Sequence, residues 1–139
     1  MSIAEQTNIL SSIEPEDFIG REREIDTLLR HAKGETTHSG MLVLATPAQG
    51  LSELLRQVYD QLFEEQGEIV PIYFEIKKSD RTHKQLAIRF LQTFLEQTVA
   101  FRRNDTKILD SSPDICEISE LATPADGYWV DRLITACTR

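Results

Sequence analysis

Residues 45–52, Ala-Thr-Pro-Ala-Gln-Gly-Leu-Ser, have the residue types and spacing best suited to phosphate chemistry. Against the pattern G-x-x-x-x-G-K-[ST], Gly50 and Ser52 match, whereas Ala45 and Leu51 replace the first glycine and the lysine. In such a loop, glycines let backbone N–H groups face the phosphates, the lysine supplies positive charge, and the hydroxyl holds magnesium. Because the lysine is missing, we expect no hydrolysis, and Ser52 would bind magnesium only if nucleotide binds. An ordinary turn between a strand and a helix is the alternative.

The elements around this loop follow from the spacing of apolar residues. Helical spacing predicts helices over about 22–33, 51–66 and 82–103, with shorter helical pieces over 115–121 and 125–137. Apolar runs bounded by turn residues predict strands over 41–45 and 69–76. Thr82 and Gln85 have capping-box spacing at the start of the third helix. The order strand, helix, strand predicts an α/β fold with a right-handed crossover.

Composition excludes several classes of function. The 139 residues include 15 Lys and Arg against 23 Asp and Glu, and this charge of -8 argues against nucleic acid and anionic membranes as partners. No apolar run reaches the roughly 18–20 residues that cross a bilayer, and the N-terminus lacks the layout of a secretory signal. The 2 cysteines and 3 histidines have no disulfide or metal-ligand spacing. We therefore expect a cytoplasmic protein without membrane contact.

A second motif lies upstream of the loop. Residues 17–25, Asp-Phe-Ile-Gly-Arg-Glu-Arg-Glu-Ile, resemble the box F-[IV]-G-R-E-x-E that opens many STAND and AAA+ ATPase modules, including the archaeal-ATPase-like group. The resemblance covers roughly residues 17–103. It implies that an adenine base lies near Ile19, Gly20 and Arg21. It implies that the phosphates lie near Thr46, Pro47, Ala48, Gln49, Gly50, Leu51 and Ser52.

The resemblance also implies a larger sheet than this sequence supplies. Modules of this type carry a later apolar strand that ends in acidic residues, and no stretch after residue 103 has that character. We therefore expect a P-loop NTPase-like strand–helix–strand unit with flanking helices and an incomplete parallel sheet. In this interpretation residues 1–17 are a flexible leader and residues 18–139 are a partial module.

Three functions are consistent with these patterns. The first is a degenerate, non-hydrolysing module of the nucleotide-binding type with a regulatory or scaffolding role. It needs no cofactor and no catalytic residue, although ATP or ADP with magnesium fits its pattern. The second is a genuine ATP-binding switch in which Arg21, or a residue supplied in trans, takes over the task of the missing lysine. The third is a small protein-interaction or oligomerisation domain that uses no nucleotide and presents strand edges. The expected partner is a protein: the missing C-terminal part of the module, a second copy, or another chain.

Overall fold

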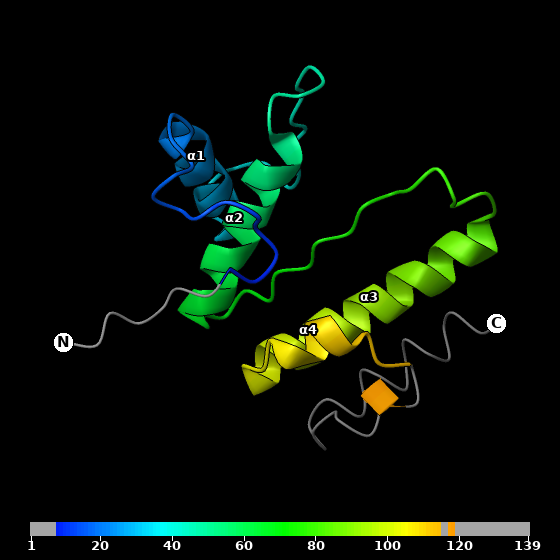
Figure 1. The fold of residues 1–139 in the computed structure, drawn as a ribbon. Helices are drawn as coiled ribbons and strands as arrows, with labels where there is room; N and C mark the ends of the chain where they lie inside the picture. Colours follow the sequence, from blue (N-terminus) through cyan, green and yellow to red (C-terminus); the bar gives the residue numbers. More distant parts are fainter. Residues whose placement is uncertain (1–7, 115–116, 119–139) are drawn as a thin grey trace. The chain divides into compact units, whose positions relative to one another are not determined.

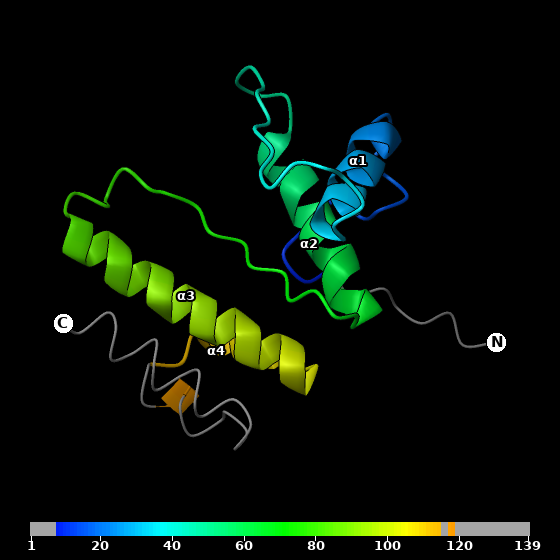
Figure 2. The ribbon, with the colours of Figure 1, turned by 180° about the vertical axis from the view of Figure 1, so that it is seen from behind.

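The structure is a computed structural model that describes residues 8–114, 117 and 118. Along the chain it divides into two compact units, with the boundary between Ile69 and Val70. Both units are helical (Figure 1; Figure 2 shows the ribbon from behind). The first unit contains α1 (Glu22–Ala32) and α2 (Leu51–Glu65), and the second contains α3 (His83–Arg103) and α4 (Lys107–Ser111).

The first unit is built on α2, an amphipathic helix whose apolar residues recur at helical spacing. Its buried apolar residues are Leu54, Val58, Tyr59, Leu62 and Phe63. Burial of one large apolar side chain contributes about 1.5–3 kcal/mol, so this row is the main stabilising feature of the unit. α1 packs against α2, and both ribbon views show the two helices side by side. No residue of α1 is fully buried.

The second unit is built on α3. Thr82 caps this helix, since its hydroxyl accepts the backbone N–H of Gln85 at 3.2 Å, which confirms the predicted capping residue. The buried apolar residues of α3 are Leu91, Leu95, Val99, Ala100 and Phe101. α3 ends at Arg103, and the next residue, Asn104, has φ 50°. α4 then packs back against α3 and buries Ile108.

The predicted α/β fold is wrong for the part of the chain that the structure describes. That part contains helices and no strand, so it is not a P-loop NTPase-like fold and has no parallel sheet, complete or incomplete. Residues 41–46 and 69–77 have neither helix nor turn. Their apolar pattern is typical of a sheet, but a strand also requires a second backbone at hydrogen-bonding distance. Leu42 and Leu44, which belong to the predicted strand over 41–45, are 83% and 84% exposed.

Residues 70–76 are attached to α3 by side chains instead of by a neighbouring strand. The Gln97 amide nitrogen donates to the Tyr73 carbonyl at 2.8 Å, and the Gln97 amide oxygen accepts the Tyr73 N–H at 2.7 Å. Further along, Arg89 donates to the Glu75 carbonyl at 2.6 Å. The Gln97 amide therefore satisfies both backbone groups of Tyr73, as a paired strand would satisfy the backbone groups of a whole segment.

The three long helices are confirmed to within one residue at each end. α4 is not predicted, because a helix of five residues is too short to show a helical period. The predicted helical pieces over 115–121 and 125–137 lie outside the described residues, except for residues 117 and 118. None of the helices in the described ranges combines the length and the apolar character that crossing a bilayer requires.

Asp80 anchors the loop that leads into α3. Its carboxylate forms an ion pair with the Arg89 guanidinium and accepts the backbone N–H of Lys77 at 2.7 Å. The hydrogen bond from Arg89, together with the one from Lys77, lowers the pKa of Asp80 below the ordinary value of 3.8. The ion pair between Asp80 and Arg89, which ties this loop to α3, therefore requires the ionised carboxyl.

We predict that this attachment persists down to about pH 4 and is lost at lower pH. Because the pKa of Asp80 is lower in the folded chain, its stabilising contribution is full above the unfolded value near 3.8 and disappears as the pH falls through the folded value. Carbon-detected NMR of the Asp80 carboxyl measures the folded pKa directly. The substitution Arg89→Gln should raise that pKa toward 3.8. A wild-type carboxyl that titrates at or above 3.8 contradicts the assignment.

Candidate functional site

The predicted phosphate loop is a tight turn that leads directly into α2. The N–H of Gln49 bonds to the carbonyl of Thr46 at 3.3 Å, with Pro47 second and Ala48 third in the turn. Ala48 has φ 66°, and Gly50, the residue before α2, has φ 72°. Proline in second place and a positive φ in third place are typical of a type II turn, in which glycine is the preferred third residue.

Residues 19–21 of the predicted adenine site form the entry to α1. Ile19 is 81% exposed, and Gly20 has φ 85°. The N–H of Gly20 donates to Oε1 of Glu22 at 3.1 Å. Hydrogen bonds from the N–H of Glu22 itself and from that of Gly20 lower the pKa of Glu22. The Gly20 amide therefore supports the first turn of α1, and Ile19 lies in solvent.

Arg21 joins the two halves of the predicted site. One terminal nitrogen of its guanidinium donates to the carbonyl of Gln49 at 3.0 Å, a contact between residues 28 positions apart. Its Nη1 lies 3.2 Å from Oε1 of Glu24. The hydrogen bond to Gln49 ties the turn to the start of α1, whereas the partly exposed ion pair with Glu24 contributes at most about 1 kcal/mol.

This geometry fixes a turn at the start of α2 but does not enclose a nucleotide. Residues 45–50 and Ser52 are exposed, and Leu51 is half-buried. Among the described residues, no group of three His, Cys, Asp or Glu side chains is arranged to hold a metal ion. Binding of ATP or ADP, and magnesium ligation by Ser52, therefore stay predictions.

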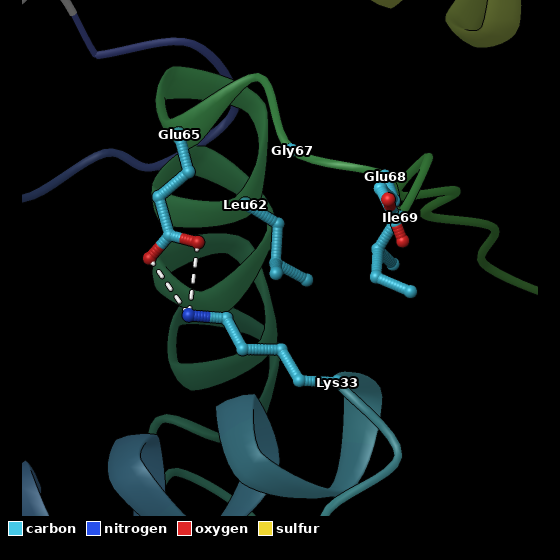
Figure 3. A pocket seen from close by; sticks show the side chains of 6 residues that line it. All are labelled: Lys33, Leu62, Glu65, Gly67, Glu68 and Ile69. Carbon is cyan, nitrogen blue, oxygen red and sulfur yellow. Dashed lines mark hydrogen bonds and ion pairs between the residues drawn. The ribbon is translucent and has the colours of Figure 1, made fainter.

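A cavity of about 250 Å³ lies beside the other end of α2 (Figure 3). Its lining residues are Lys33, Leu62, Glu65, Gly67, Glu68 and Ile69. Lys33 follows α1 and reaches across to α2, where its Nζ lies 2.9 and 3.1 Å from the two carboxylate oxygens of Glu65. This ion pair satisfies the lysine charge within the protein. None of the residues predicted for the nucleotide site lines the cavity.

Three polar side chains of α2 that have no role in the predicted site are buried. Glu53, Gln57 and Asp60 are 9%, 1% and 6% exposed. Their spacing places them along one face of the helix, which is covered by residues 9–13, here called the N-terminal arm. The spacing is visible in the sequence, but polar residues on a solvent-exposed helix face have the same spacing. Only their burial under the arm distinguishes them.

Asp60 binds the first half of the arm through backbone groups. It accepts three consecutive N–H groups, those of Ile9 at 3.0 Å, Leu10 at 2.8 Å and Ser11 at 3.2 Å. It also accepts the Ser11 hydroxyl at 2.6 Å. Successive N–H groups that converge on one carboxylate form an anion-binding nest, here occupied by a side chain of the same unit.

Glu53 and Gln57 bind the second half of the arm. Oε1 of Glu53 accepts the N–H groups of Ser12 at 2.9 Å and Ile13 at 3.0 Å. Gln57 donates to the carbonyl of Ile13 at 2.6 Å and to Glu53 at 3.1 Å. Every backbone N–H group from residue 9 to residue 13 is therefore bonded to a carboxylate of α2.

We predict that Ala48→Gly stabilises the first unit by about 0.5–1 kcal/mol, because glycine adopts a positive φ without the steric cost that alanine bears. Denaturant unfolding followed through NMR signals of α2 reports on this unit separately from the second. The matched control is Ala45→Gly, at a position that does not have a positive φ, and we expect it to lower the stability. An Ala48→Gly chain less stable than wild type contradicts the turn geometry.

Comparison with known protein families, with curated proteins and with solved structures found no match for this chain. The resemblance of residues 17–25 to the STAND and AAA+ box therefore stays a prediction from the sequence.

Proposed function

We propose that this chain is a protein-interaction module that self-associates through the extended segment Met41–Ala45 and uses no nucleotide. The observation that carries this function is the exposure of Leu42 and Leu44, which are 83% and 84% accessible. Apolar surface of this kind gains free energy when a partner removes it from water, by about 25 cal/mol for each Å² covered. Neighbouring exposed leucines therefore mark a surface for association.

The segment offers both an apolar face and open backbone groups. In an extended chain alternate side chains share a face, so Leu42 and Leu44 lie together on one side of the segment. The backbone of residues 41–45 makes no hydrogen bond to another described residue of the chain. A partner strand would satisfy these groups while its side chains cover the leucines.

Charge favours a second copy as that partner. Residues 36–52 contain no Asp, Glu, Lys or Arg, although charged residues make up 27% of the sequence. Two copies that each carry a net charge of -8 repel one another over most of their surfaces. This uncharged stretch is where they approach at the smallest electrostatic cost. A strongly acidic or basic partner would find no opposite charge here.

An antiparallel pair of these segments is self-complementary. Pairing about a two-fold axis at Val43 places Leu42 of one copy opposite Leu44 of the other. Each apolar cross-strand pair contributes about 0.2–1 kcal/mol, and a two-stranded pair alone is marginally stable in water. We therefore expect a weak dimer whose population rises with protein concentration.

The two nucleotide-based functions have less support. Leu51 brings no charge to the turn, and Arg21, the replacement for the lysine that this chain itself offers, bonds to Gln49 and Glu24. In the proposed module the same contact between Arg21 and Gln49 has a structural role, because it ties the turn that follows Met41–Ala45 to the start of α1.

We predict that light scattering after size-exclusion chromatography gives a mass that rises from 15.9 kDa toward twice that value as the concentration increases. The double variant Leu42→Lys/Leu44→Lys should dimerise about ten-fold or more weakly than the wild type, because it places charge in the paired face. Addition of ATP or ADP with magnesium should leave the mass unchanged.

The matched control is Ile19→Lys/Ile76→Lys, which adds the same charge at two other exposed apolar positions. We expect this control to dimerise as the wild type does. A wild-type chain that is monomeric throughout, or a control that loses the dimer to the same extent, overturns the proposed function. A mass that rises only with ATP supports the nucleotide switch instead.

A further inference from the structure

The backbone of the N-terminal arm forms most of the hydrogen bonds between the arm and α2. Its five N–H groups are all bonded to Asp60 or Glu53. Of its aliphatic side chains, Ile9 and Leu10 are half-buried and Ile13 is exposed. The polar face of α2 therefore recognises the path and the backbone hydrogen-bond donors of an extended chain.

We propose that the face of α2 formed by Glu53, Gln57 and Asp60 is a peptide-binding site, and that the arm of a second copy is its partner in trans. The covalently attached arm occupies the site in the single chain. The exchange goes beyond the proposed pairing of residues 41–45 and does not depend on it, since it uses different residues and different chemistry.

The bound arm defines what the site accepts. A ligand must present five consecutive N–H groups, which excludes proline over that stretch. It must place a hydroxyl where the Ser11 Oγ lies, 2.6 Å from Asp60. It must then turn a carbonyl toward Gln57, as Ile13 does at 2.6 Å. An acidic side chain at the Ser11 position would meet the Asp60 carboxylate and be repelled.

A second copy meets these requirements because its arm forms the same bonds with the same atoms. Exchange of identical segments leaves the hydrogen bonds of the site unchanged, so its cost is the entropy of association and the opening of the connection to α1. That connection is held by local turn contacts, from Asp17 N–H to the Glu14 carbonyl at 3.0 Å and from Phe18 N–H to the same carbonyl at 3.1 Å. These contacts do not involve α2, so the arm can move as a segment.

Emptying the site without filling it is costly. The carboxylates of Glu53 and Asp60 and the amide of Gln57 are each less than 10% exposed. A buried carboxylate that loses its donors is strongly destabilising until water or another donor replaces them. The site therefore favours the exchange of one arm for another over release of the arm into solvent.

The test uses the full chain with its own arm disabled by Leu10→Pro/Ser12→Pro, which removes two of the five donors. The probe is a fluorescent synthetic peptide with the sequence of residues 7–14, and its binding is followed by fluorescence anisotropy. We expect the peptide to bind the disabled chain saturably. Its affinity for the wild-type chain should be lower by about ten-fold or more, because the wild-type arm competes for the site. Addition of Asp60→Asn to the disabled chain should lower the affinity of that chain for the peptide.

The decisive control is the same peptide N-methylated at Leu10 and Ser12, which keeps both side chains and removes two backbone donors. We expect it to bind about ten-fold or more weakly than the unmodified peptide. Equal binding of the two peptides overturns the site, as does the absence of saturable binding to the disabled chain. If the proline variant loses helical circular dichroism, Ser11→Asp disables the arm instead, because its carboxylate is repelled by that of Asp60, and the expected results are the same.

A further control separates this site from the pairing of residues 41–45. Adding Leu42→Lys/Leu44→Lys to the disabled chain should leave its affinity for the peptide unchanged. If the wild-type chain never self-associates although the disabled chain binds the peptide, the pairing of residues 41–45 and the exchange between copies are both overturned, and the face of α2 binds only the arm of its own chain. If the dimer is intact but the disabled chain does not bind the peptide, the α2 site is overturned and the pairing of residues 41–45 is kept.

Discussion

Side chains of the helices form hydrogen bonds with the backbone groups of the non-helical segments, and the described fold depends on these bonds. On α2, Glu53 and Asp60 accept the N–H groups of the arm, and on α3, Gln97 bonds to both backbone groups of Tyr73. Buried backbone groups must find partners, and in the described residues helical side chains provide them where a sheet would otherwise do so. Each irregular segment is thereby tied to a helix at a few points and left open elsewhere.

This arrangement produces two different kinds of surface. The arm has its donors satisfied, so a competing segment can only replace it by forming the same bonds. Residues 41–45 make no backbone bond to another described residue and expose Leu42 and Leu44, so a partner there adds bonds that the single chain lacks. On the first surface one arm can replace another, and on the second a partner strand can be added. Both lie in the first unit, and both involve the backbone as much as the side chains.

The helices were predictable because their stabilising pattern is local. The rows containing Leu54 and Leu91 repeat every three or four residues, and Thr82 marks a helix start within four residues of sequence. The strands were not predictable in the same way, because the apolar run Met41–Ala45 indicates suitability for a sheet and not the presence of a neighbour. The predicted phosphate turn lies where expected, at the start of α2, but its residues are exposed and only Arg21 reaches it from the predicted adenine side.

The sequence by itself determined where the three long helices begin and end, which of their faces are apolar, and where the chain turns into α2. It did so because helical hydrogen bonds and turn geometries involve residues at most a few positions apart. Only the tertiary structure decided that the apolar segments stay unpaired in the described chain and that Glu53, Gln57 and Asp60 are buried. Those outcomes depend on contacts between residues 40 to 51 positions apart, or on the lack of them, and no local spacing encodes such contacts.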